Sequence, residues 1–376
     1  MIKKIGFVSS TDPFMDKTAW SGTTYRVREA IEKAGYEVVW IPYKASRMAT
    51  NAIKAMYYLR YGWGTKFQYA SAYTRVLARS LDKEKIEEVD AVFFCGMGGL
   101  AHYCNITKPI FCLGDGTFRL LKDYYWKGVH PQVAKEIDHF DRIGINASTA
   151  EIRASRWAAD SVVKDYGKAS EHTYVLEFGA NIDSIDANPI FPYKGEGELQ
   201  VLFSGVDWQR KGARKAIETI EILNRRGVKA HLLLVGLKEI PERYRDHPYI
   251  TNIGFLDKND EQQYRKYIET IRRAHVFLMP TTAECAGIVF SEASAFGIPS
   301  YTCLTGGTGS YVRNGINGYT LPPDADASDF ADTIIGSLST AKQQQLHEGA
   351  LRLYEERLSW EAWARGFRKI IEQETK

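Results

Sequence analysis

Short runs of apolar and β-branched residues alternate with amphipathic stretches along most of this chain. Such runs are typical of strands, and apolar residues three or four positions apart are typical of helices. In the first half a helix is expected over 24–34, with Gly35 as its end. The expected strands of this half are 3–10, 36–42, 89–96, 108–114 and 141–147.

The same alternation starts again in the second half. Its expected strands are 199–205, 230–235 and 275–280, and its expected helices are 213–226, 260–274 and 287–296. Strands that alternate with helices predict the α/β class with doubly wound parallel sheets. Residues 181–198 show no periodicity, so we expect an N-terminal domain over 1–183, a linker over 184–198 and a C-terminal domain over 199–358.

Composition and charge are those of a globular protein: 44% of the residues are hydrophobic, 25% are charged, and the formal net charge is +3. No apolar run reaches the roughly 18 residues that a spanning helix needs. The first ten residues read as a strand rather than a signal peptide. The five Cys form no CxxC pair, which indicates reduced thiols and no zinc site. We therefore expect a cytoplasmic protein.

Two glutamates flank the start of one expected helix. Glu284 lies in the loop that follows a buried strand, and Glu292 lies one to two turns into the helix that begins near Gly287. The glycine allows a ligand to approach the backbone, and the N–H groups of Ile288 and Val289 would form an anion site at the helix N-terminus. Two carboxylates beside an anion site suit a nucleotide sugar, whose hydroxyls would bind the carboxylates.

A pair of cations follows the first strand of the second half. Arg210 and Lys211 come shortly after Gly205. Cleavage of a sugar–phosphate bond releases negative charge on the diphosphate, and fixed cations stabilise that charge. The alternative for this segment alone is a solvated basic turn that caps the next helix.

These two segments resemble the retaining glycosyltransferases of family 4, which have the GT-B fold. The family signature is Glu, seven residues, Glu and then a Gly-Pro turn, which matches Glu284, Glu292 and Gly297-Ile-Pro299; its Gly…Arg/Lys-Lys-Gly element matches 205–212. The resemblance implies that Glu284 holds donor-sugar hydroxyls and that Glu292 holds the ribose hydroxyls. Ala286 stands where the family usually has Phe, which puts the shape of the sugar pocket in doubt.

The resemblance also implies a GT-B architecture of two Rossmann-like domains that face a central cleft. By the same resemblance, the terminal helix 359–376 packs back onto the N-terminal domain, Gly307 lies in a glycine turn near the diphosphate, and the strand end at Gly254, Phe255 and Leu256 reads the base. A plain turn and a plain strand end remain the alternatives.

Two segments of the N-terminal half are candidates for the acceptor side. Trp20, Ser21, Gly22 and Thr23 open the first helix, where they would contact the acceptor or the diphosphate, or serve only as an N-cap. Asp115 ends another strand where many family members have His, and it would orient or deprotonate the acceptor hydroxyl. A turn-forming Asp between glycines is the alternative.

Residues 44–79 combine basic and aromatic side chains, and no acidic residue occurs in 38–81. A solvated helical face and contact with a membrane surface, at the inner face of the membrane, both remain open. Nucleic acid is not expected, because the domain is only mildly basic.

The function expected from these residues is that of a retaining, metal-independent hexosyltransferase without a cofactor, acting in polysaccharide or glycan biosynthesis. A hexosyl or N-acetylhexosaminyl group would pass from a nucleoside diphosphate sugar to a hydroxyl of a saccharide acceptor, which is either free or linked to a lipid. UDP is expected as the donor nucleotide in preference to GDP. A nucleotide-sugar 2-epimerase on the same fold and a catalytically silent sugar-nucleotide-binding partner are the alternatives.

Overall fold

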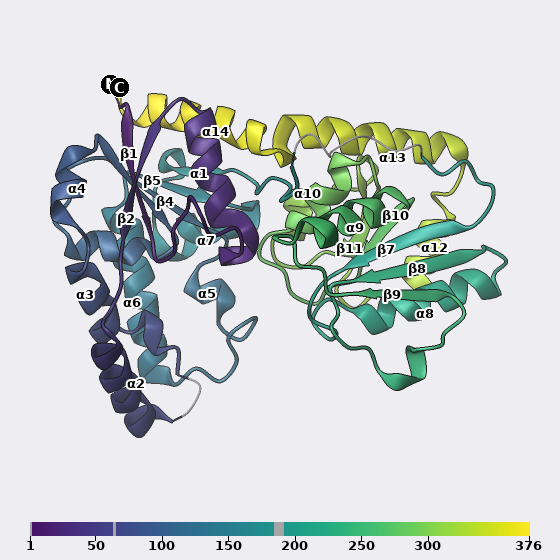
Figure 1. The fold of residues 1–376 in the computed structure, drawn as a ribbon, viewed down its shortest axis with the longest axis horizontal. Coiled ribbons are helices and arrows are strands. Elements are labelled where there is room, and N and C mark those ends of the chain that lie inside the picture. Colours follow the sequence, from purple (N-terminus) through teal and green to yellow (C-terminus); the bar gives the residue numbers. More distant parts are fainter. Residues whose placement is uncertain (1, 63–64, 184–191) are drawn as a thin grey trace. The chain divides into compact units, whose positions relative to one another are not determined.

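The computed structural model describes residues 2–62, 65–183 and 192–376, which form two compact units. The first unit comprises Met1–Leu176 and Trp363–Lys376, and the second comprises Glu177–Ala362. Each contains a parallel six-stranded sheet flanked by helices (Figure 1). The α/β class predicted from the alternating pattern is therefore confirmed. Part of the predicted linker, 184–191, lies outside the described residues.

The sheet of the first unit has the strand order β2-β1-β3-β4-β5-β6. Its strands are β1 (Lys4–Ser9), β2 (Glu37–Pro42), β3 (Ala91–Cys95), β4 (Ile110–Gly114), β5 (Ala150–Arg153) and β6 (Thr173–Val175). The helices of its main segment are α1 (Thr23–Lys33), α2 (Arg47–Tyr61), α3 (Ser71–Arg79), α4 (Lys83–Glu88), α5 (Phe118–Leu121), α6 (Pro131–Ala147) and α7 (Arg156–Tyr166). The chain order reverses between β1 and β3, so the loops after these strands meet at a switch point of the sheet.

One predicted strand of this unit is wrong. Residues 141–147 are the last turns of α6, and the strand of that region, β5, begins only at Ala150. The β-branched residues Ile143 and Ile145 of this short run are typical of a strand, but the buried residues of α6 follow a helical period from Val133 through Ile137 and Phe140. The longer period decides the structure because this face packs into the core of the unit.

The sheet of the second unit has the order β12-β11-β10-β7-β8-β9. Its strands are β7 (Leu199–Ser204), β8 (Ala230–Val235), β9 (Ile250–Gly254), β10 (Val276–Met279), β11 (Ser300–Cys303) and β12 (Gly318–Leu321). Its helices are α8 (Ala213–Arg225), α9 (Glu261–Arg272), α10 (Ile288–Ala295), α11 (Thr308–Tyr311), α12 (Ala327–Ile335) and α13 (Thr340–Leu353). Here the chain order reverses between β7 and β10, where a ligand crevice is expected in such sheets.

The last helix, α14 (Trp360–Glu374), contributes aromatic side chains to the first unit. The ring of Phe367 stacks on Trp363 at 5.1 Å between centroids and meets Phe93 of β3 edge-on at 5.5 Å. These rings join the end of the chain to the first sheet. Among the described residues, no helix has the length and apolar character needed to cross a membrane.

Candidate functional site

The loops that follow β7 and β10 are joined to each other at the switch point of the second sheet. The carbonyl of Arg210 accepts hydrogen bonds from the N–H of Thr282, at 2.8 Å, and from the hydroxyl of Thr281, at 3.0 Å. Gly212, with φ of 75°, lies so close to the second loop that a Cβ would stand 2.1 Å from the carbonyl oxygen of Pro280. Only glycine fits here, which fixes the position of the residues before it.

This junction brings the predicted Arg210 and Lys211 to the predicted Glu284. The ammonium group of Lys211 donates to Oε2 of Glu284, and both residues are buried. The guanidinium of Arg210 donates to the carbonyl of Ala283 at 3.1 Å and lies 3.8 Å from the same carboxylate oxygen. Two cations and a carboxylate at a helix N-terminus can bind a ligand that carries both phosphate and hydroxyl groups.

Asp207, which was not predicted, shapes the loop of the two cations. Its Oδ1 accepts the N–H groups of Gln209 and Arg210, at 3.1 and 2.9 Å, and its Oδ2 lies 3.6 Å from Nε of Arg210. The signal in the sequence was an Asp two residues before the first of these N–H groups, the usual pattern of an Asx turn.

The glycine that precedes α10 is required by packing. A Cβ on Gly287, the N-cap residue of α10, would lie 2.3 Å from the ring of Phe290. The N–H groups of Ile288 and Val289, in the first turn, have no acceptor within the helix by the geometry of α-helices. The predicted Gly307 joins the same place, because its N–H donates to the carbonyl of Glu284 at 2.9 Å. The two glycine turns and Glu284 thus form one continuous loop system.

The second glutamate of the motif lies deep in α10 and has two donors. Glu292 is 2% exposed; its Oε1 accepts from the ammonium group of Lys258 at 2.6 Å, and its Oε2 accepts from the hydroxyl of Tyr267. Burial, followed by the charge of Glu292, raises the pKa of Tyr267 well above its ordinary value, so the phenol stays a donor.

Sequence reasoning missed both partners of Glu292. Lys258 comes from the loop after β9, and its ammonium group lies 4.2 Å from the centre of the Tyr267 ring. Tyr267 belongs to the buried face of α9, where a tyrosine reads simply as a core residue. Lys258 comes only two positions after the predicted Leu256, and this short distance along the chain could have indicated that Lys258 belongs to the site.

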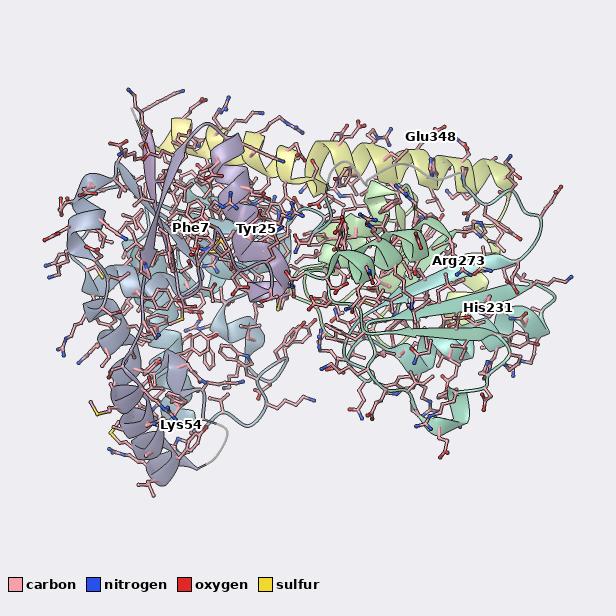
Figure 2. All side chains as sticks on the ribbon, viewed as in Figure 1. Phe7, Tyr25, Lys54, His231, Arg273 and Glu348 are labelled. Atoms are coloured by element: carbon pink, nitrogen blue, oxygen red, sulfur yellow. The ribbon has the colours of Figure 1, made fainter. Side chains whose placement is uncertain are left out.

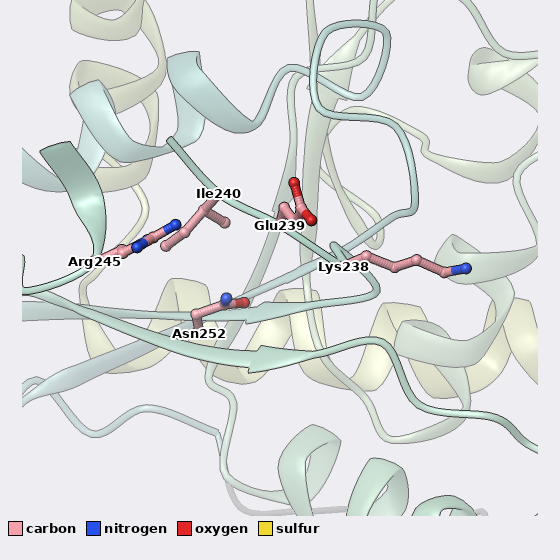
Figure 3. A pocket seen from close by; sticks show the side chains of 5 residues that line it. All are labelled: Lys238, Glu239, Ile240, Arg245 and Asn252. Carbon is pink, nitrogen blue, oxygen red and sulfur yellow. The ribbon is translucent and has the colours of Figure 1, made fainter. Parts of the chain in front are cut away.

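The predicted base-reading segment, Gly254 to Leu256, begins at the last residue of β9 and lies beside a pocket of about 250 Å³. Lys238, Glu239, Ile240, Arg245 and Asn252 line this pocket (Figure 3). Gly254 holds the neighbouring loop through its carbonyl, which accepts the N–H of Gly236 at 2.9 Å. Phe255 is 46% exposed, and the Lys238 ammonium group lies 5.5 Å from its ring centre. An exposed aromatic ring beside a pocket offers a surface on which a planar base can stack.

In the first unit, the structure joins the two predicted acceptor-side segments to each other. The indole N–H of Trp20 donates to Oδ2 of Asp115 at 3.3 Å, across 95 residues of sequence. Trp20 and Ser21 both have left-handed backbone angles, with φ of 50° and 58°. For residues other than glycine this backbone conformation costs free energy, and it occurs most often at functional sites.

The capping alternative for this turn is wrong. The N-cap of α1 is Gly22, without a hydrogen bond from a side chain, so neither Ser21 nor Thr23 caps the helix. The hydroxyl of Thr23 is buried and has no hydrogen-bond partner among the described residues.

Asp115 lies in a turn fixed by a buried arginine. The guanidinium of Arg153, at the end of β5, donates to the carbonyl of Gly116 at 3.1 Å and lies against Gly114. Burial, followed by the charge of Asp115, raises the pKa of the nearby Tyr69.

The second unit matches a known protein family over most of its length. Residues 186–352 match the family model described as Glycosyl transferases group 1. A sucrose synthase of Melioribacter roseus is 26% identical over 136 residues, which are 34% of this chain and 17% of that protein. A D-inositol 3-phosphate glycosyltransferase of Xylanimonas cellulosilytica is 25% identical over 249 residues, 62% of this chain and 58% of that one. The chain thus spans less than two thirds of these curated relatives.

Solved structures match over nearly the whole chain. A glycosyltransferase from Rickettsia africae superimposes with a TM-score of 0.66 at 14% identity and covers 100% of this chain and 99% of its own. A sucrose-phosphate synthase from Thermosynechococcus elongatus gives 0.67 at 16%, covering 99% and 98%. The Anabaena protein HepE, in complex with UDP and glucose, gives 0.62 at 13%, covering 99% and 100%. At these identities the likeness establishes the fold, and it confirms the predicted GT-B fold.

Proposed function

We propose that the protein is a retaining glycosyltransferase, because residues 186–352 match the family model of the group 1 glycosyl transferases. It moves a hexosyl or N-acetylhexosaminyl group from a nucleoside diphosphate sugar to a hydroxyl of a saccharide acceptor. UDP is the preferred nucleotide, which the complexes of the similarly folded HepE with UDP and with UDP-glucose support. The enzyme acts on the cytoplasmic side of the membrane in glycan synthesis.

The observation that carries this proposal is the cluster of Arg210, Lys211 and Glu284 at the switch point of the second sheet. The donor diphosphate binds Arg210, Lys211 and the N-terminus of α10, while the hydroxyls of the donor sugar bind Glu284. Because Arg210 and Lys211 supply fixed positive charge where the diphosphate departs, the reaction needs no metal ion.

The transfer step follows from this placement of charge. The bond between C1 of the sugar and the diphosphate oxygen breaks, and its electron pair leaves with the oxygen. The acceptor hydroxyl attacks C1 from the same face, and its proton passes to the departing phosphate oxygen. Configuration at C1 is thereby retained, and a protein base is optional.

The remaining parts of the donor have partners in the same unit. The ribose hydroxyls bind Glu292, which Lys258 and Tyr267 hold in place. The base lies along the backbone of Gly254 to Leu256, with the ring of Phe255 beside it.

The acceptor binds in the first unit, where Asp115 and the turn at Trp20 orient its hydroxyl. A saccharide carried on a lipid is the acceptor form that a membrane-bound enzyme would use.

A thermal-shift panel of UDP, GDP and ADP sugars tests the proposal, followed by product analysis. A ligand at a hundred times its dissociation constant adds about 2.7 kcal/mol to the free energy of unfolding. We expect one UDP sugar to raise the melting temperature and to yield UDP and a retained glycoside with a saccharide acceptor. Conversion of UDP-N-acetylglucosamine to an epimer without acceptor would contradict the transferase and favour the epimerase. Binding without transfer or hydrolysis would favour a silent partner.

A further inference from the structure

The helix α2 of the first unit carries large apolar side chains on its solvent face. Met48, Met56 and Leu59 are 83%, 48% and 90% exposed. With the exposed Ala52 and Ala55 they are spaced by three, four or one positions, which places all five on one side of the helix. Globular proteins rarely leave a contiguous apolar patch in water without a partner.

Positive side chains border this stripe on both sides. By helical position, the exposed Arg47 and Lys54 lie on one flank and the exposed Arg60 on the other; Figure 2 labels Lys54. The segment 38–81 contains no acidic residue that could neutralise them. We call the side chains of Arg47, Met48, Lys54, Met56, Leu59 and Arg60 the α2 surface.

The inner side of α2 is fixed, so the α2 surface is presented on a rigid element. Tyr57 is buried, and its hydroxyl donates to Glu136 of α6 at 2.6 Å. The same carboxylate oxygen accepts the N–H of Ser71 at 2.9 Å. Glu136 is therefore engaged beneath the helix. The hydroxyls of Thr50 and Tyr73 lie 3.3 Å apart and form a second link.

We propose that the α2 surface docks on an anionic lipid bilayer. Met48, Met56 and Leu59 enter the boundary between headgroups and acyl chains, and Arg47, Lys54 and Arg60 meet the lipid phosphates. An apolar stripe bordered by cations is the pattern of helices that lie in the membrane interface. Nucleic acid would use the cations but leave the methionines and the leucine in water. The inference is independent of sugar transfer, since it rests on a surface of the first unit alone.

The test is sedimentation of the full chain with vesicles, without donor or acceptor. We expect binding at low salt to vesicles of phosphatidylcholine with one third phosphatidylglycerol, and little binding to phosphatidylcholine alone. The variant Met48→Gln/Met56→Gln/Leu59→Gln should bind at least tenfold more weakly. The variant Arg47→Gln/Lys54→Gln/Arg60→Gln should lose about a hundredfold, since each cation near the surface contributes about fivefold.

A matched control removes the same number of charges from another helix. Arg265, Lys266 and Arg273 are exposed on and just after α9, and Figure 2 labels Arg273. Their replacement by Gln should leave vesicle binding within about twofold of the unmodified protein, while circular dichroism confirms that every variant is folded.

Three results would overturn the proposal. The first is no binding to the anionic vesicles at low salt. The second is binding that survives both α2 variants or falls equally in the α9 control. The third is self-association, or binding to single-stranded RNA, that depends on the α2 surface while vesicles do not bind. A protein with no transfer activity can still pass this test, so its failure is distinct from failure of the proposed reaction.

Discussion

The ammonium group of Lys211 donates a hydrogen bond to the carboxylate of Glu284, which lies 73 positions further along the chain. Both residues are buried, and removal of one partner from a buried ion pair typically costs about 3–5 kcal/mol. Without donor, the two charges neutralise each other. A nucleotide sugar offers a replacement to each, the diphosphate for Lys211 and sugar hydroxyls for Glu284. On the proposed function, the pair should therefore favour a ligand that carries both groups over a nucleotide alone.

The close approach of Gly212 to Pro280 predicts that Gly212→Ala damages the site. The substitution combines a φ of 75° with a Cβ placed 2.1 Å from a backbone oxygen, so the loop of the two cations must move. We expect a loss of at least about 2 kcal/mol in the free energy of unfolding, measured by urea denaturation, together with loss of donor binding.

Gly227, beyond the other end of α8, provides the matched control. Its φ is 86°, but no atom lies within 4 Å of the position of its Cβ. Gly227→Ala should cost only about 1 kcal/mol and leave donor binding unchanged. Equal effects of the two substitutions would mean that the contact with Pro280 does not position the cations.

The role of Glu292 predicts how the enzyme distinguishes nucleotides. If its carboxylate holds the ribose hydroxyls, the unmodified protein should bind UDP about tenfold to a hundredfold more tightly than 2′,3′-dideoxy-UDP. In Glu292→Ala that preference should disappear, because both ligands then lack the acceptor. Calorimetric titration of both nucleotides checks this. A preference that persists in the variant would place the ribose elsewhere.

The hydrogen bond between Trp20 and Asp115 predicts an effect on transfer but not on donor binding. Asp115→Asn keeps the size of the side chain and removes its charge, so kcat/KM for the acceptor should fall about tenfold to a hundredfold. The dissociation constant of the donor should not change. Trp20→Phe, which removes the indole N–H and leaves a smaller aromatic ring, should have a smaller effect. Unchanged transfer by Asp115→Asn would refute a role of this carboxylate in the reaction.

A buried carboxyl of the first unit predicts a dependence of stability on pH. Burial raises the pKa of Asp141 to about 6, although its carboxylate accepts the N–H of Phe118 at 2.6 Å. The folded state therefore binds a proton more tightly than the unfolded chain, whose pKa is 3.8. The contribution of this group to stability is present at about pH 4 and is lost as the pH rises through about 6.

Asp141→Asn removes this dependence and keeps an oxygen for the N–H of Phe118. The free energy of unfolding of the variant, minus that of the unmodified protein, should increase by roughly 1–3 kcal/mol between about pH 4 and about pH 7. Urea denaturation at the two pH values measures the difference. A difference independent of pH would show that Asp141 is ionised with an ordinary pKa.

Much of the fold could be predicted from the sequence because many strands of the two sheets are short runs of mostly apolar residues. The segments 36–42 and 199–205 became β2 and β7 for this reason. The strand predicted over 141–147 is wrong because a short run with β-branched residues inside a longer helix resembles a strand when its neighbours are ignored. Only the packing of the whole buried face of α6 distinguishes a helix from a strand over 141–147.

The same limit applies to the site. Glu284, Glu292, Arg210 and Lys211 stand out because charged residues follow apolar runs at a spacing that a family shares. Tyr267 gives no such signal, since its hydroxyl reaches Glu292 from a different helix. The bond between Trp20 and Asp115 likewise depends on the strand order, which separates β1 and β4 by β3 alone. Contacts of this kind follow from sheet order, which a single sequence does not state.

If Lys211 and Glu292 bind one nucleotide sugar, as proposed, saturating UDP sugar should raise the melting temperature through both side chains. Arg214→Ala is the control, because Arg214 is an exposed cation of the same helix region that pairs only with the neighbouring Glu218 in the described structure. We predict that the melting temperature rises with ligand in the unmodified protein and in Arg214→Ala, and that Lys211→Ala and Glu292→Ala lose most of the rise. An undiminished rise in melting temperature in both site variants would contradict binding of the nucleotide sugar by Lys211 and Glu292.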